Sequence, residues 1–311
     1  MTSLICGSLA FDTIMLFDGR FSEAILADQL HKVNVAFLVP SLRREFGGCA
    51  GNIAYNLKLL GGDPLIMATI GQDGASYLER LDRLGISRRA IRTMDSSYTA
   101  QAFITTDADN NQITAFHPGA MGASHENKVA DAGAVKLAIV APDGRTGMQQ
   151  HAADCAKLGV PFIFDPGQGL PMFNGAELAH FIELATYVAV NDYEAELLTE
   201  RTSLTLEQIA QRVSALIVTR GELGAEIYAG GGERIDIACV KAEAVIDPTG
   251  CGDAFRAGLM YGLTHGMDWA TTGRLASLMG AIKIAHQGGQ NHAPSREEIA
   301  ERFNAAFGYR Y

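Results

Sequence analysis

The sequence predicts an α/β fold in which helices flank both faces of a mostly parallel central sheet, with a small second sheet standing off this core. Short apolar runs such as Leu137–Val140 and Tyr187–Val190 alternate with helical patterns. These runs are continuously apolar, as is typical of strands covered on both faces. Two β-like segments, at residues 12–46 and 98–116, interrupt the alternation and predict the second sheet.

The core elements follow in order along the chain. Apolar runs predict strands at residues 4–7, 65–70, 137–140, 161–164, 187–190 and 216–219. Helical periodicity predicts helices at residues 49–60, 76–84, 146–157, 192–200, 206–213, 252–264, 268–286 and 295–306. In the helix at 49–60, for example, Ile53, Leu57 and Leu60 form one apolar stripe.

The second sheet has its clearest signal in residues 98–116, which alternate in polarity around an Asx-rich turn at residues 107–111 and so predict a β-hairpin. The chain has no internal repeat or low-complexity linker, which favours one core over two independent domains. We therefore assign residues 1–11, 47–96 and 121–311 to an α/β core, and residues 12–46 and 97–120 to the discontinuous second sheet.

Composition narrows the classes of function. The 311 residues are 48% apolar, which is enough for a full buried core. A net charge of −10 argues against a nucleic-acid-binding surface. The chain lacks an apolar run long enough to span a membrane and a signal-peptide pattern, so we expect a cytoplasmic protein. Its five cysteines show no Cys-x-x-Cys spacing, which favours free thiols over disulfides or a zinc site.

The most informative segment is Asp247–Phe255, which opens the helical pattern at 252–264. Glycines at a helix start leave N–H groups unobstructed, so the backbone of Gly250, Cys251 and Gly252 can hold an anion. A carboxylate in such a turn repels phosphate, but it makes sense if it accepts a proton from a hydroxyl that attacks phosphorus. Asp253 is therefore the candidate general base, and an ordinary Asp-capped turn is the alternative.

This segment resembles the C-terminal signature of the ribokinase (PfkB) family of sugar and nucleoside kinases, and it fills every fixed position of that pattern. Gly47–Asn52 resembles the family's second signature, and several segments are most similar to bacterial adenosine kinase-like purine nucleoside kinases. The resemblance covers the whole chain. It implies a ribokinase-like fold in which the small sheet is a lid over the acceptor, with ATP and Mg²⁺ as cofactors.

On the acceptor side, the resemblance implies that Asp12 binds two sugar hydroxyls and Asn52 another, while Gly47 and Gly48 let the sugar ring lie against backbone. Phe116 belongs to a set of aromatic residues in the predicted lid, and such a surface suits a purine base. The chain departs from the family's sugar kinases, which often carry Asn-x-Asp where this chain has Ala-Phe-Asp. A lone Asp12 would more often be a helix or turn cap, but its order and distance relative to Gly47 and Gly48 favour a ligand; any single lid aromatic is more often a packing residue.

On the nucleotide side, Asn191 and Glu194 follow a predicted strand and are similar to the family's Asn-x-x-Glu element, which acts on Mg²⁺ and phosphate through water. An Asn-Asp pair is also an ordinary helix N-cap. Thr219, Gly221 and Gly224 resemble the family's Thr-x-Gly-x-x-Gly nucleotide element, for which a hairpin turn is the alternative.

Two further positions follow from the resemblance. Asn291 lies in a loop that borders the adenine site in the family. Asp247 and Thr249 match positions that bind a monovalent cation such as K⁺ in many relatives, and local capping of the turn is the alternative there.

The sequence thus predicts ATP-dependent phosphorylation of the 5′-hydroxyl of a purine nucleoside: adenosine, inosine or guanosine. A sugar kinase of the same family, acting on ribose, fructose or a sugar phosphate, and a non-catalytic ligand sensor on the same fold are the alternatives. A Rossmann dehydrogenase is disfavoured because no Gly-x-Gly-x-x-Gly follows the first strand, and no lysine is preceded by glycine as a P-loop requires. The expected partners are small molecules, not nucleic acid or membrane, and the chain is expected to be a monomer or a homodimer through the lid.

Overall fold

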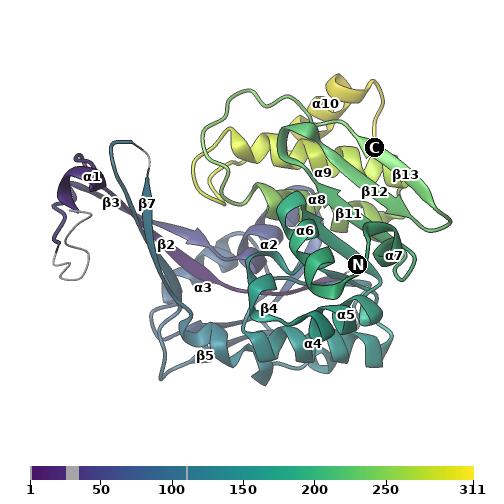
Figure 1. Ribbon diagram of the computed structural model, residues 1–311, viewed down its shortest axis with the longest axis horizontal. Helices are drawn as coiled ribbons and strands as arrows, with labels where there is room; N and C mark the ends of the chain where they lie inside the picture. Colours follow the sequence, from purple (N-terminus) through teal and green to yellow (C-terminus); the bar gives the residue numbers. More distant parts are fainter. Residues whose placement is uncertain (1, 26–34, 110) are drawn as a thin grey trace.

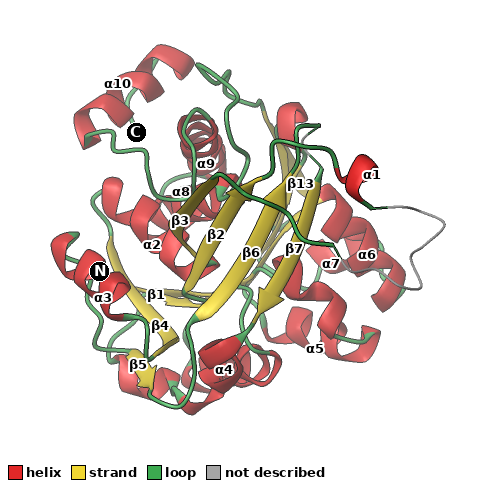
Figure 2. Cartoon of the chain, turned by 90° about the vertical axis from the view of Figure 1, so that its left-hand side faces the viewer, coloured by secondary structure: helices red, strands yellow, loops and turns green. Residues whose placement is uncertain are grey.

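The structure is a computed structural model that describes residues 2–25, 35–109 and 111–311, and this part of the chain forms two sheets (Figures 1 and 2). The larger sheet has nine strands in the order β13-β12-β11-β10-β9-β8-β1-β4-β5. Its pairings are parallel from β5 to β11 and antiparallel from β11 to β13. The prediction of a mostly parallel α/β core is confirmed.

The bounds of the core elements are as follows. The strands are β1 (Thr2–Cys6), β4 (Asp63–Gly71), β5 (Ile91–Met94), β8 (Leu137–Val140), β9 (Phe162–Phe164), β10 (Tyr187–Asn191), β11 (Ala215–Thr219), β12 (Ala225–Ala229) and β13 (Glu233–Ile237). The α-helices are α2 (Cys49–Leu59), α3 (Ala75–Arg83), α4 (Arg145–Leu158), α5 (Gly175–Leu184), α6 (Asp192–Thr202), α7 (Leu206–Ala210), α8 (Cys251–His265), α9 (Trp269–Ile284) and α10 (Arg296–Phe307). Short 3-10 helices lie at η2 (Gly119–Glu126), η3 (Val129–Ala132), η4 (Gly167–Met172) and η5 (Gly221–Leu223).

Several details differ from the sequence expectations, which listed neither the helix α5 nor the strands β12 and β13. The helix expected at 206–213 ends at Ala210, because the chain must turn before β11 begins at Ala215. The strand β5 was not predicted, since its four residues carry a mixed polar and apolar pattern.

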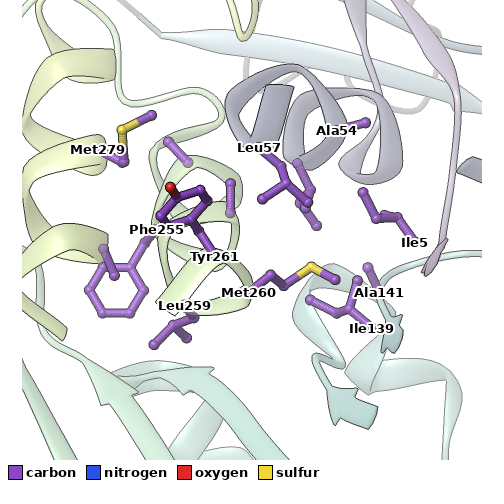
Figure 3. Packing of buried hydrophobic residues seen from close by; sticks show 14 of the residues in the cluster. Ile5, Ala54, Leu57, Ile139, Ala141, Phe255, Leu259, Met260, Tyr261 and Met279 are labelled. Atoms are coloured by element: carbon purple, nitrogen blue, oxygen red, sulfur yellow. The ribbon is translucent and has the colours of Figure 1, made fainter. Parts of the chain in front are cut away.

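Alternate strand residues build two apolar layers, one on each face of the large sheet. In β8, Leu137 and Ile139 join the layer formed with α2, α3, α8, α9 and α10, whereas Ala138 and Val140 join the layer formed with α4, α5, α6 and α7. Figure 3 shows the first layer, where Leu57 of α2 and Met260 of α8 gather with strand residues of the sheet. This packing places the N-terminus of α8 at a fixed position relative to the strands.

The second sheet has four strands in the order β3-β2-β6-β7 and extends away from the core at one side of the molecule (Figures 1 and 2). Its strands are β2 (Ala10–Leu16), β3 (Ser41–Gly47), β6 (Ala100–Thr106) and β7 (Gln112–His117), and the short helix α1 (Phe21–Ala24) follows β2. The predicted hairpin is β6-β7, in whose turn Asp107 Oδ1 accepts hydrogen bonds from the backbone N–H groups of Asp109 and Asn111. Residues 26–34 of the expected lid, and Asn110 of the turn, lie outside the described residues.

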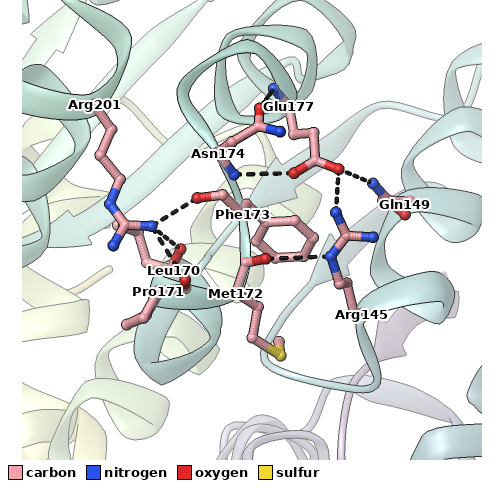
Figure 4. Close-up of polar contacts among 9 residues, drawn as sticks. All are labelled: Arg145, Gln149, Leu170, Pro171, Met172, Phe173, Asn174, Glu177 and Arg201. Atoms are coloured by element: carbon pink, nitrogen blue, oxygen red, sulfur yellow. Dashed lines mark hydrogen bonds and ion pairs between the residues drawn. The ribbon is translucent and has the colours of Figure 1, made fainter.

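A polar network fastens the segment that follows β9 (Figure 4). Asn174 and Glu177 form a capping box at the start of α5, and Glu177 also pairs with Arg145 of α4. Arg201 of α6 donates to the carbonyl oxygen of Phe173 at 2.6 Å. These contacts from α4, α5 and α6 fix the segment that follows Asp165. The Asp165 side chain is part of the site described next.

Candidate active site

The start of α8 places Asp253 at the centre of the site. Gly250 precedes the helix with φ 78°, a left-handed conformation that favours glycine, and Asp253 lies in the first turn. Asn52 Nδ2 of α2 donates to Asp253 Oδ2 at 2.9 Å. Burial raises the pKa of Asp253 from 3.8 to about 6, with the hydrogen bond from Asn52 acting in the opposite direction. The carboxylate is therefore ionised at neutral pH and closer in pKa to a working general base than an exposed Asp.

The backbone at this helix start supplies donors for an anion, because first-turn N–H groups lack intrahelical partners. Of the three N–H groups predicted to bind an anion, that of Cys251 donates to the carbonyl of Pro248 at 3.1 Å and so is already bonded within the turn. A Cβ added at Gly252 would meet no atom within 4 Å, so the space beside this glycine is open. Burial raises the pKa of the Cys251 thiol to about 11, which leaves it protonated and unsuited as a nucleophile at neutral pH.

The predicted acceptor residues Asp12, Gly47, Gly48 and Asn52 come together where the second sheet joins the core. A Cβ at Gly47 would lie 2.4 Å from Asp12 Oδ2, and one at Gly48 would lie 2.5 Å from the carbonyl oxygen of Ser8. Gly48, which also has φ 85°, thus requires glycine, and a side chain at Gly47 would displace the Asp12 carboxylate. Burial, followed by the nearby Glu45, raises the pKa of Asp12 to about 6. The Asp12 charge also raises the pKa of Asp253, so the two carboxylates lie close enough to interact electrostatically.

The predicted contact residue Phe116 lies further out on the second sheet. Strand register aligns Glu45 with Asp12, Asp12 with Ala102, and Ala102 with Phe116, so this row of side chains shares one face of the sheet. Phe116 is 54% exposed and available for contact. Phe11, on the opposite face, is instead buried against Phe46 and Tyr77 and is a packing residue.

Residues that the sequence did not reveal orient Asn52. Gln290 Nε2 donates to Asn52 Oδ1 at 3.1 Å and to the Tyr77 hydroxyl at 2.9 Å. The Tyr77 hydroxyl donates to the Gly47 carbonyl at 2.8 Å, and Arg80 donates to the Gln290 carbonyl at 2.6 Å. Because the Asn52 oxygen is occupied by Gln290, its NH₂ group is directed toward Asp253.

Asn291, predicted to border adenine, connects the loop after α9 to the second sheet. Its Nδ2 donates to Glu45 Oε2 at 2.9 Å and to the Gln287 carbonyl at 2.9 Å. Glu45 was not predicted as a site residue, although it lies directly opposite Asp12 on β3. The contact to adenine remains a prediction.

On the nucleotide side, Asn191 and Glu194 form a capping box at the start of α6, so the N-cap alternative is confirmed. Glu194 Oε2 accepts the Asn191 N–H at 2.9 Å, and Asn191 pairs in register with Thr219 of β11. Burial, followed by the Asp165 charge, raises the pKa of Glu194. Asn191 and Thr219 therefore lie side by side at the carboxyl edge of the sheet, where ligands bind in open α/β folds.

The Thr219–Gly224 segment forms the turn between β11 and β12. A Cβ at Gly224 would lie 2.0 Å from the Ile237 carbonyl oxygen, so this glycine is required by the hairpin. Gly221 has φ 53°, and a Cβ there would meet no atom within 4 Å. The hairpin alternative is thus confirmed for Gly224, and Gly221 faces open space.

A buried ion pair that the sequence did not reveal lies between these two halves of the site. Arg256, one helical turn after Asp253, donates to both Asp165 oxygens, at 3.2 and 3.1 Å, and both side chains are buried. Asp165 raises and Arg256 lowers the pKa values of both Asp253 and Glu194. The sequence did carry one sign of this ion pair: Arg256 interrupts an otherwise apolar helix stripe.

Asp247 and Thr249, the predicted cation ligands, stabilise the turn before α8. Asp247 Oδ1 accepts the Thr249 N–H at 2.9 Å, and Oδ2 accepts the Gly288 N–H at 2.8 Å. The carboxylate thus joins the turn before α8 to the loop after α9, in agreement with the capping alternative.

Protein side chains alone form no ready metal centre here. Among the described residues, no group of three His, Cys, Asp or Glu side chains is arranged to hold a metal ion. Within the described ranges, no helix is both long and apolar enough to cross a lipid bilayer.

Several known proteins similar to this chain are nucleoside kinases. The chain is 32% identical to the nucleoside kinase of Methanocaldococcus jannaschii over 274 residues, covering 86% of this chain and 89% of that protein. It is 30% identical to the nucleoside kinase of Methanothermobacter thermautotrophicus over 306 residues, covering 96% and 97%. The structure of Burkholderia thailandensis nucleoside kinase in complex with inosine is 61% identical, with a TM-score of 0.90 and 99% of each chain covered.

The family assignment follows from a direct match. Residues 12–296 match the pfkB family carbohydrate kinase model, and this span contains Asp12, Asn52 and Asp253. The ribokinase-like fold and its small lid sheet agree with this match. The chain therefore belongs to the pfkB family of carbohydrate kinases, which transfer a phosphoryl group to a hydroxyl acceptor.

Proposed function

We propose that this kinase transfers the γ-phosphoryl group of ATP to the 5′-hydroxyl of a purine nucleoside, with Asp253 as the general base. The observation that carries the proposal is the convergence of Asp253, Asn52 and Asp12 where the lid meets the N-terminus of α8. The similarity to the inosine complex of the Burkholderia thailandensis enzyme supports a nucleoside acceptor.

In the proposed reaction, the acceptor hydroxyl oxygen attacks the γ-phosphorus while Asp253 takes the hydroxyl proton. The new O–P bond forms as the bond from the γ-phosphorus to the bridging oxygen breaks, and ADP leaves with that electron pair. The N–H groups of Gly250 and Gly252 stabilise the transferring phosphoryl group, because the helix dipole and first-turn donors favour negative charge there. A general base contributes about 10² to 10⁴ in rate.

The nucleotide is proposed to lie along the edge formed by Thr219, Gly221 and Gly224. Support for this placement comes from the open space at Gly221. Use of an adenine nucleotide is supported by a second Burkholderia thailandensis nucleoside kinase structure, in complex with ADP-inosine (63% identity, TM-score 0.88). Glu194 is the residue proposed to act on Mg²⁺ through water, while Oε2 remains bonded to Asn191. Mg²⁺ would neutralise charge on the phosphates when bound.

The lid sheet is proposed to bind and recognise the acceptor substrate. Asp12 would accept two ribose hydroxyls, and Phe116 would contact the base from the same face of the lid sheet. A sugar kinase remains the second candidate, favoured by Arg43 and Arg44 on β3, which a sugar phosphate could use. Arg44, however, already pairs with Asp73 at 3.1 Å and lies over the Phe11 ring.

The test is ADP release from Mg-ATP with adenosine, inosine, guanosine, ribose, fructose and fructose 6-phosphate as acceptors. We expect turnover on the purine nucleosides. Turnover on sugars alone would refute the nucleoside assignment but leave Asp253 as the proposed base. Turnover by Asp253→Asn at the wild-type rate would refute the mechanism.

A further inference from the structure

A fully buried lysine next to the site is not used by the proposed mechanism. Lys283 lies in the last turn of α9 and is 0% exposed. Lysine is almost never fully buried unless its charge has partners. Its Nζ donates to the carbonyl oxygen of Asp247 at 2.7 Å and to that of His286 at 2.9 Å.

These two carbonyls belong to the segments that frame the helix start. Asp247 begins the turn that leads into α8, and His286 begins the loop that leads to Gln290 and hence to Asn52. The Asp247 carboxylate joins the same two segments through its bond to the Gly288 N–H. The ammonium group therefore lies at the junction of the anion-binding turn and the loop after α9. The C-terminal end of α9 is a favourable place for a cation.

A monovalent cation does not fit this junction in addition to Lys283. Such an ion needs several oxygen ligands, and two carbonyl oxygens of the junction already accept hydrogen bonds from the ammonium group. The two oxygens of the Asp247 side chain are likewise bonded to backbone N–H groups. A second positive charge sharing these oxygens would be repelled by the first.

We propose that the Lys283 ammonium group takes the place of a monovalent cation in this kinase, so that the anion-binding turn is positioned without K⁺. Lys283 is a positioning residue in this proposal, because it reaches the phosphoryl site only through the carbonyl of Asp247. The proposal rests on the proposed function for its turnover assay but not for its binding and melting assays.

The wild-type enzyme gives the first test. ADP release on a purine nucleoside is measured with K⁺ and with a bulky organic cation, at the same ionic strength of about 0.1 M. We expect rates within about twofold of each other, since the cation is part of the chain. Activation of the wild type by K⁺ of about tenfold or more, which corresponds to about 1.4 kcal/mol of stabilisation from the added ion, would overturn the proposal.

Two variants give the second test. Lys283→Ala removes the charge and opens space, so we expect turnover to fall about tenfold or more and to recover when K⁺ or NH₄⁺ is added. Lys283→Met removes the charge but fills the space, so we expect a similar fall without recovery. Lys58→Ala is the matched control, because Lys58 Nζ also donates to a carbonyl, that of Gly85, but in an exposed position on α2.

Two readouts separate this proposal from the nucleoside assignment. Calorimetric affinity for Mg-ADP and the Tm need no acceptor, and both are expected to respond to K⁺ in Lys283→Ala but not in the wild type. A folded Lys283→Ala that turns over at the wild-type rate and ignores K⁺ would overturn the proposal. If Lys283→Ala does not fold, the K⁺ response of the wild type decides the matter alone.

Discussion

Replacing the proposed general base, Asp253, should make the protein more stable while it lowers turnover. Burial raises the pKa of Asp253 from 3.8 to about 6 in the folded state. Between these two values the folded chain binds a proton that the unfolded chain does not, so the stability of the wild type falls as pH rises through this window. A difference of about two pKa units corresponds to about 3 kcal/mol, and partial solvation lowers this to about 2 to 3 kcal/mol.

Asp253→Asn removes the charge but keeps an oxygen that accepts from Asn52. We expect its free energy of unfolding in urea to exceed that of the wild type by about 2 to 3 kcal/mol near pH 7.5, and the gap to close near pH 4, where the wild-type carboxyl is protonated. Turnover should fall by about 10² to 10⁴. A gap that is independent of pH, or a variant less stable than the wild type at both pH values, would refute the burial argument.

A matched control is available in the next helix. Asp268 is the exposed N-cap of α9 and accepts the Thr271 N–H at 2.8 Å. Asn and Asp cap helices about equally well, so Asp268→Asn should neither stabilise the protein nor reproduce the pH-dependent gap. Any general effect of an Asp-to-Asn change would appear in this control.

Three further predictions concern the surroundings of the base. Asn52→Leu removes the hydrogen bond that lowers the pKa of Asp253, so the acid limb of a kcat/KM against pH profile should move up by about one to two pH units. Gly252→Ala should keep the wild-type Tm, because its Cβ would meet no atom within 4 Å, yet raise the KM for ATP by crowding the phosphate. Arg256→Met leaves Asp165 buried without its partner, and urea unfolding should show a loss of about 3 to 5 kcal/mol.

Each of these has a contradicting outcome. Asn56 lies one turn from Asn52 and donates to its backbone carbonyl at 2.9 Å, so Asn56→Leu removes a buried amide without touching Asp253. Asn56→Leu should leave the acid limb in place, and equal shifts in both variants would refute the Asn52 assignment. An unchanged KM for ATP in Gly252→Ala, or an unfolding loss below about 1 kcal/mol in Arg256→Met, would refute the other two.

The parts of the site that could be predicted are those contained in one short stretch of chain. The turn Asp247–Phe255 places donors and base within nine residues, so local backbone rules were enough to propose its chemistry. The mostly parallel sheet was predictable for a similar reason, because most of its parallel strands carry their own apolar run. Neither inference needed knowledge of which distant segments meet.

The missed residues depend on distant partners. Arg256 and Asp165 are 91 residues apart, and Gln290 and Asn52 are 238 residues apart, so no spacing rule relates them. The Asn191 and Glu194 pattern is ambiguous for another reason, because the same two residues fit a capping box and a metal element equally well. Geometry confirms the cap and leaves the second role to experiment.

The charges around the base imply how the phosphates must be neutralised. The two buried cations described above already have partners, Arg256 in the Asp165 carboxylate and Lys283 in two carbonyl oxygens. Asp12 adds a further negative charge on the acceptor side. We infer that neither cation is available to pair directly with an incoming triphosphate. In the proposed reaction, the negative charge of ATP would therefore be met by the N-terminus of α8 and by the proposed Mg²⁺, which favour negative charge without drawing on either buried cation.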